Sequence, residues 1–99
     1  MIRHHKQIRL GATPSSDGSC LFCVWAPFAS NVSLVIVSPL EREVRMTRDT
    51  EGYHTAVVEG VSVGTRYWYS LDGRVQRPDP ASRYQPLGVH GPSEVVPAV

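Results

Sequence analysis

The sequence predicts an all-β domain, an antiparallel β-sandwich of immunoglobulin-like type. Short apolar or alternating runs are interrupted by turn residues at intervals of roughly 8–12 residues, and no run has a helical period. The 99 residues, 41% of them hydrophobic, suffice for one modest core. A small closed barrel would show the same pattern and remains an alternative. An extended tail rich in proline and glycine follows the last strand.

The first three strands are expected at Ile8–Leu10, Cys20–Trp25 and Asn31–Val37. Ser15–Gly18 offers turn chemistry through Asx bonding and a glycine, and predicts a hairpin between the first two. The second run is apolar on both faces, as in a strand buried in the middle of a sandwich. On this reading Trp25 is interpreted as a core residue.

The remaining strands are expected at Val44–Arg48, Tyr53–Val58, Thr65–Leu71 and Arg74–Gln76. The alternation in Val44–Arg48 is typical of a half-exposed edge strand. Asp72-Gly73 is a two-residue turn and gives the strongest hairpin signal in the chain.

Cys20 and Cys23 have the spacing of a redox pair or of half a zinc site. In a strand, however, an offset of three residues puts them on opposite faces about 10 Å apart, beyond the roughly 7 Å that a disulfide tolerates between Cα atoms. We therefore expect two buried thiols in the β core. The histidines lack metal-ligand spacing with these cysteines, and no phosphate-binding loop is present, so neither a metal nor a cofactor is predicted.

The charge balance of ten Lys/Arg against nine Asp/Glu provides no basic stripe and argues against nucleic-acid binding. No segment approaches the roughly 18 consecutive apolar residues that would cross a membrane. Residues 1–10 lack the apolar centre of a secretory signal. The expected location is the cytoplasm, with no membrane partner.

The acidic residues do not form the facing carboxylate pair that glycoside hydrolysis needs. Most lie in predicted turns, where they solvate the surface. Asp79 differs, because Pro78 and Pro80 fix its backbone, and we interpret it as a structural acceptor or a partner for Arg77 or Arg83. No catalytic residue is predicted.

Sugar binding is considered for the face of Thr65–Leu71 that carries Trp68. If Tyr67 and Tyr69 fill the core, Trp68 points outward together with Arg66 and Ser70. Exposed aromatic faces stack on sugar rings while guanidinium groups bond hydroxyls. Burial under a neighbouring domain and core packing are the other interpretations of Trp68. The candidate glucan contacts are Trp68, Arg66 and Tyr84.

The tail, from Arg77 to Val96, combines helix- and sheet-breaking residues with bulky side chains suited to contacts. We expect a strap that crosses a surface and is excluded from the sheets by its proline and glycine content. This divides the chain into a sandwich, residues 1–76, and an interdomain strap, residues 77–99. The candidate interdomain contacts are Arg77, Asp79, Arg83, Tyr84, Gln85, His90 and Ser93.

Several motifs carry a family resemblance: Val24-Trp25-Ala26-Pro27, Gly64–Tyr69, Pro78–Pro86 and Gly88–Ser93. Together they resemble the N-terminal domain of malto-oligosyltrehalose trehalohydrolases, α-amylase-type enzymes of glycoside hydrolase family 13. The first two are similar to family-48 carbohydrate-binding modules in general, which also occur in branching and debranching enzymes. This similarity implies an immunoglobulin-like sandwich of the early-set type. The last two are similar to the trehalohydrolase subgroup.

This resemblance implies a downstream (β/α)8 catalytic domain as the partner of the chain, in an enzyme that hydrolyses the α-1,4 bond releasing trehalose. Such a barrel needs about 250 residues, so no catalytic residue can be transferred to this chain. The chain is then either a domain cut from a longer protein or the start of one. The alternatives are an autonomous module that binds α-glucan or malto-oligosaccharide, the N-terminal domain of a glycogen branching or debranching enzyme, and a partner-binding sandwich.

Overall fold

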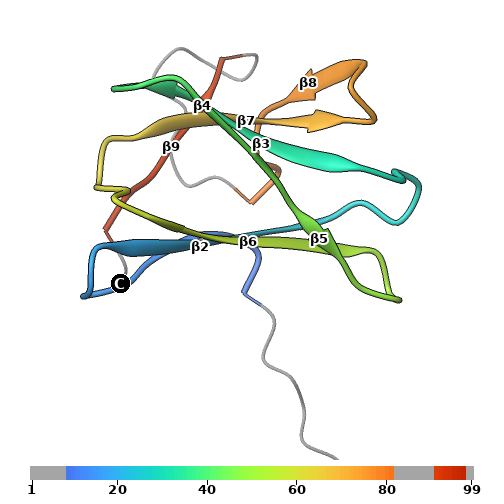
Figure 1. Ribbon diagram of the computed structural model, residues 1–99, viewed down its shortest axis with the longest axis horizontal. Coiled ribbons are helices and arrows are strands. Elements are labelled where there is room, and N and C mark those ends of the chain that lie inside the picture. Colours follow the sequence, from blue (N-terminus) through green and yellow to red (C-terminus); the bar gives the residue numbers. More distant parts are fainter. Residues whose placement is uncertain (1–8, 82–90, 98–99) are drawn as a thin grey trace, which may run out of the picture.

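The computed structural model describes residues 9–81 and 91–97 and contains two antiparallel sheets that face each other (Figure 1). One sheet has the order β1-β2-β6-β5, and the other has the order β4-β3-β7-β8, with β9 also paired to β7. The strands are β1 (Gly11–Pro14), β2 (Ser19–Trp25), β3 (Val32–Ser38), β4 (Arg42–Arg45), β5 (Thr47–Arg48), β6 (Tyr53–Glu59), β7 (Arg66–Leu71), β8 (Val75–Arg77) and β9 (Ser93–Glu94). This division matches the immunoglobulin arrangement, so the sandwich is confirmed over the closed barrel.

The core lies between the sheets and follows the predicted alternation. Leu34 of β3 and Tyr67 and Tyr69 of β7 are buried, and the rings of Phe22 in β2 and Tyr67 make a T-shaped contact with centroids 5.0 Å apart. The opposite face of β7 carries Trp68, which pairs across the sheet with Val35 of β3. The prediction that the tyrosines of β7 fill the core is therefore confirmed.

Two predicted strands differ from the structure. The first strand begins at Gly11, which pairs with Cys23, rather than at Ile8–Leu10; Leu10 precedes it and Ile8 is outside the described residues. The expected strand Val44–Arg48 is two strands in different sheets. The chain crosses between them at Met46, which is buried and donates its N–H to the Val32 carbonyl at 2.9 Å. Alternation alone does not reveal such a crossing, because the apolar residues still fall on the inner side.

Both cysteines are buried, at 0% exposure for Cys20 and 4% for Cys23, and neither forms a disulfide. Desolvation raises the pKa of the Cys20 thiol to about 11, so it stays protonated at neutral pH. The expectation of buried thiols is confirmed. Nowhere in residues 9–81 and 91–97 is there a helix long and apolar enough to cross a membrane.

The tail does enter a sheet, contrary to the expectation from its proline and glycine content. Ser93 and Glu94 form β9 and pair with Tyr67 and Arg66 of β7, and Val95 is wholly buried. A two-residue edge strand needs only a short stretch free of proline, and Pro92 and Pro97 lie just outside it.

Candidate functional site

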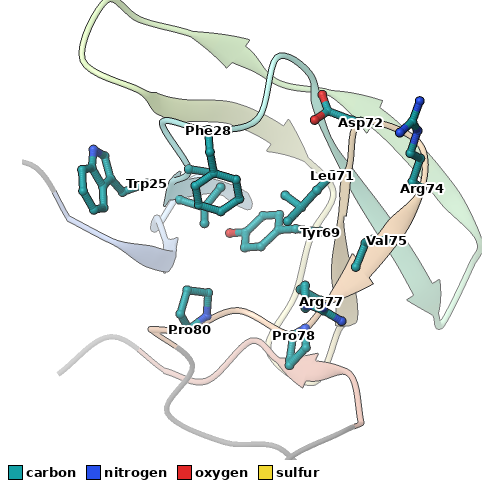
Figure 2. Close-up of a pocket in the computed structure, with 12 residues that line it drawn as sticks. Trp25, Phe28, Tyr69, Leu71, Asp72, Arg74, Val75, Arg77, Pro78 and Pro80 are labelled. Carbon is teal, nitrogen blue, oxygen red and sulfur yellow. The ribbon is translucent and has the colours of Figure 1, made fainter.

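An apolar groove opens at one end of the sandwich, where the end of β2 and the turn that follows it face the β7–β8 hairpin and the beginning of the tail (Figure 2). Its volume is about 850 Å³. We call it the Trp25 groove and define it by its apolar residues Trp25, Phe28, Leu71, Val75, Pro78 and Pro80. Among the surfaces of the described residues, this one combines the largest side chains that the core leaves exposed.

Trp25 is 54% exposed, so its interpretation as a core residue is wrong. Strand β2 buries Val24 on its inner face and turns Trp25 to the outer one, a distinction that a run apolar on both faces conceals. The indole is nevertheless fixed: its Nε1–H donates to the Glu51 carbonyl at 3.1 Å, and its ring lies against Tyr53 with centroids 6.4 Å apart. An exposed indole ring with a fixed orientation is well suited to binding a partner.

Phe28 is 79% exposed and lies on a turn whose backbone is held by hydrogen bonds. Ala29, its neighbour, is buried and donates its N–H to the Ala26 carbonyl at 3.1 Å, while Arg48 Nη2 donates to the Pro27 carbonyl at 3.1 Å. The turn therefore presents the phenyl ring to solvent on a supported backbone.

Asp72 links the two walls of the groove. It occupies the left-handed region at φ 52°, in the turn between β7 and β8. Its Oδ1 accepts the N–H groups of Ser30 and Asn31 at 2.9 and 2.8 Å. Asparagine and aspartate tolerate this backbone conformation better than other residues that carry a Cβ. The hairpin and the Phe28 turn are thus held at a fixed separation.

Asp79 fixes the third side of the groove. Pro78 and Pro80 line the groove, whereas Asp79 between them is only 3% exposed. Its Oδ2 accepts the hydroxyls of Tyr67 at 2.6 Å and Tyr69 at 3.3 Å, and its Oδ1 accepts the Ala81 N–H at 3.0 Å. The predicted role of structural acceptor is confirmed.

The electrostatics of this cluster follow from burial. Burial raises the pKa of Asp79, and the hydrogen bonds from Tyr67, Ala81 and Tyr69 oppose that change. Burial, reinforced by the nearby carboxylate, also raises the pKa of both tyrosines, which remain neutral donors. Among the described residues no cation contacts Asp79, and its side chain accepts hydrogen bonds there from the hydroxyls of Tyr67 and Tyr69 and from the Ala81 N–H.

The candidate interdomain residues are divided by the structure. Ser93 is wholly buried, and its Oγ accepts the Asp79 N–H at 2.9 Å, so both residues make their recorded contacts within this domain. Arg77 is exposed at the end of β8 and lines the groove. The other candidates, Arg83, Tyr84, Gln85 and His90, are outside the described residues.

The candidate glucan contacts lie on a different surface. Trp68 and Arg66 are half-buried on the outer face of β7, as predicted, and Arg66 Nε pairs with Glu94 Oε1 at 3.3 Å. Tyr84 is outside the described residues. Neither Trp68 nor Arg66 contributes to the Trp25 groove.

Several acidic residues serve the turns in which they were predicted to lie. Asp17 Oδ1 accepts the Ser19 N–H at 3.0 Å, and Asp49 Oδ1 accepts the N–H groups of Glu51 and Tyr53 at 2.8 and 3.0 Å. In the part of the chain that the structure describes, no three metal-ligating side chains come together.

Comparison with known proteins agrees with the fold and the motifs. Residues 9–85 match the family of carbohydrate-binding module 48 (isoamylase N-terminal domain). The chain is 50% identical over 76 residues to the malto-oligosyltrehalose trehalohydrolase of Saccharolobus solfataricus, and 38% identical over 95 residues to that of Deinococcus radiodurans. These matches cover 76% and 95% of this chain but only 13% and 15% of the two relatives.

Among solved structures, a Salmonella typhimurium protein assigned as an alpha amylase superposes with a TM-score of 0.80 at 34% identity. The superposition covers 88% of this chain and 14% of that protein. These relatives are much longer than the chain, which fits an accessory domain of a glycoside hydrolase. The chain belongs to the carbohydrate-binding module 48 (isoamylase N-terminal domain) family.

Proposed function

We propose that this chain is the non-catalytic accessory domain of a malto-oligosyltrehalose trehalohydrolase and that the catalytic domain docks on the Trp25 groove. The parent enzyme would hydrolyse the α-1,4 bond that releases trehalose, as a cytoplasmic step of trehalose biosynthesis. The main observation behind the docking proposal is that Trp25 and Phe28 are 54% and 79% exposed in an apolar groove whose walls are held by hydrogen bonds.

Burial of these two side chains by a neighbouring domain would remove apolar surface from water, which stabilises the contact by about 25 cal/mol per Å². Clustered exposed apolar residues on a small domain commonly mark such an interface. The similarity to trehalohydrolases supports a catalytic domain as the occupant, because this chain corresponds to only 13% and 15% of those proteins. The two buried thiols agree with a reducing compartment.

The test is a domain-replacement enzyme, the S. solfataricus trehalohydrolase in which this chain replaces the matched region. We expect it to fold and to release trehalose from malto-oligosyltrehalose. A replacement enzyme that fails to fold, or that folds without releasing trehalose, would contradict the trehalohydrolase assignment.

The docking surface is tested by Phe28→Ala, with Leu40→Ala as the matched control. Both side chains are 79% exposed in this chain, but only Phe28 lines the groove. In the isolated chain each substitution should change the free energy of unfolding by no more than about 0.5 kcal/mol. In the replacement enzyme Phe28→Ala should cost about 1–2 kcal/mol, as for a residue near the centre of an interface, and Leu40→Ala should stay near zero. Thermal unfolding of the four variants and of the two unsubstituted proteins measures these costs, and equal effects of the two substitutions in the enzyme would disprove docking on this groove.

The second candidate function is α-glucan binding by Trp68 and Arg66, either by an autonomous module or within a branching or debranching enzyme. The match to a carbohydrate-binding module family and the position of both residues on the outer face of β7 support it. Titration of the chain with maltoheptaose should then quench tryptophan fluorescence with a dissociation constant of about 1 mM or below, and Trp68→Ala should abolish the change. The absence of saturation at millimolar sugar would argue against this function.

A further inference from the structure

Two arginines at the rim of the Trp25 groove, Arg74 and Arg77, indicate which charges a partner should present. In β8, Val75 and Arg77 face the groove, whereas Gln76 between them lines a separate hollow on the other side of the sheet. Arg74, in the turn before β8, also reaches the rim (Figure 2). Both arginines are exposed, and neither guanidinium has a recorded hydrogen bond or ion pair within residues 9–81 and 91–97.

The two carboxyl groups near the groove already accept hydrogen bonds from groups of this domain. Asp72 Oδ1 accepts two backbone N–H groups, those of Ser30 and Asn31. Asp79 is 3% exposed and is turned toward the tyrosine hydroxyls. Three charged side chains therefore face solvent at the rim. Asp72 has hydrogen-bond partners within the described residues, whereas the guanidinium groups of Arg74 and Arg77 have none there.

A partner that covers the apolar part of the groove also takes water away from these arginines. Burying a guanidinium group without a counter-charge is strongly unfavourable, whereas a carboxylate placed opposite it forms a charge-assisted pair, often with two parallel hydrogen bonds. The planar guanidinium is the cationic group best suited to such an interface.

We infer that the groove binds a protruding apolar element of a folded protein domain, flanked by carboxylates that face Arg74 and Arg77. This inference rests on the proposed docking of the catalytic domain and adds the chemistry of the surface that the catalytic domain presents. A neutral glucan chain offers hydroxyl groups but no such charges.

The experiment uses the domain-replacement enzyme with Arg74→Glu and Arg77→Glu combined. The control is Arg42→Glu, an exposed arginine on β4 whose Nη1 donates to the Glu59 carbonyl and which does not line the groove. The double reversal should accelerate thermal inactivation by about tenfold or more over the control, because charged residues truncated or reversed in an interface leave their partners unpaired. The acceleration should diminish at about 1 M NaCl, where the Debye length falls to about 3 Å. The isolated chain should unfold at an unchanged temperature, which shows that the variant folds.

The outcomes separate this inference from the docking proposal. If Phe28→Ala destabilises the enzyme while the double reversal inactivates it at the same rate as Arg42→Glu, the docking proposal stands. In that case the inference that carboxylates face Arg74 and Arg77 is wrong. If neither change has an effect, the docking proposal fails and this inference fails with it. The isolated chain offers one competing occupant, the exposed Leu40 beside Glu41 and Glu43 in a second copy. Concentration-dependent association in sedimentation equilibrium, removed by Leu40→Ala, would assign the groove to that second copy and overturn the inference.

Discussion

Replacement of Asp79 with alanine is expected to lower the free energy of unfolding by about 3 kcal/mol or more. The change removes three hydrogen bonds to the Asp79 side chain and leaves the hydroxyls of Tyr67 and Tyr69 buried without that acceptor. It also releases Pro78 and Pro80, so the wall of the groove should shift. Urea unfolding followed by tryptophan fluorescence measures the loss.

The matched control for this substitution is Asp17→Ala. Like Asp79, Asp17 is a hydrogen-bond acceptor: its Oδ1 accepts the N–H and the hydroxyl of Ser19. Unlike Asp79, it is exposed. Its loss should cost no more than about 1 kcal/mol. Equal costs at the two positions would show that the buried cluster does not stabilise the fold.

The pH dependence of this effect follows from the raised pKa of Asp79, whose ordinary value is 3.8. Because the folded domain holds the proton to a higher pH than the unfolded chain does, the contribution of this group to stability is fully present below the unfolded pKa. The part of that contribution that depends on the bound proton is lost as the pH rises through the folded pKa, while the three hydrogen bonds that the side chain accepts remain. Relative to Asp79→Asn, which cannot ionise, the unsubstituted domain should therefore lose stability over that interval. A difference that grows in the opposite direction would contradict the sign.

Gly52→Ala is the second change with a large expected effect. Gly52 has φ +92°, and an added Cβ would lie 2.6 Å from both Cα and Cβ of Pro27, a contact that the backbone must move to relieve. Gly52 also accepts the Ala26 N–H at 2.9 Å, so the movement should reach the segment that carries Trp25 and Phe28. The overpacking should add about 1–3 kcal/mol to the cost of the strained backbone.

Gly60→Ala is the control that separates the backbone penalty from the steric cost at Gly52. Gly60 has φ +74°, and an added Cβ would meet nothing within 4 Å. It should show only the backbone penalty of about 1–2 kcal/mol. Thermal unfolding of both variants gives the difference, and equal transition temperatures would mean that Pro27 moves aside without cost.

The elements with clear alternation could be predicted from the sequence. In β7, the side chains of Tyr67 and Tyr69 had to share a face opposite Trp68, and the structure places them so. The role of Asp79 as an acceptor also followed from its two proline neighbours. Short-range patterns sufficed in these cases because the relevant geometry is set within a few residues.

The groove itself could not be predicted, because it joins segments far apart in the sequence. Trp25 and Phe28 meet Leu71 and Pro80 only after the sheets have stacked. The one local signal was Pro27, which ends β2 and leaves the residues around it at the margin of the sheet. Likewise, the pairing of β9 depends on a distant edge of β7, and local propensity does not report on free edges.

Hydroxyl-radical footprinting of Phe28 is the most direct test of docking on the Trp25 groove. The side chain is 79% exposed in this chain and should be oxidised readily, as should Leu40 at the same exposure. In the domain-replacement enzyme, the account predicts that Phe28 becomes protected while Leu40 is oxidised at its former rate. Oxidation of Phe28 at the same rate in the isolated chain and in the enzyme would contradict the account.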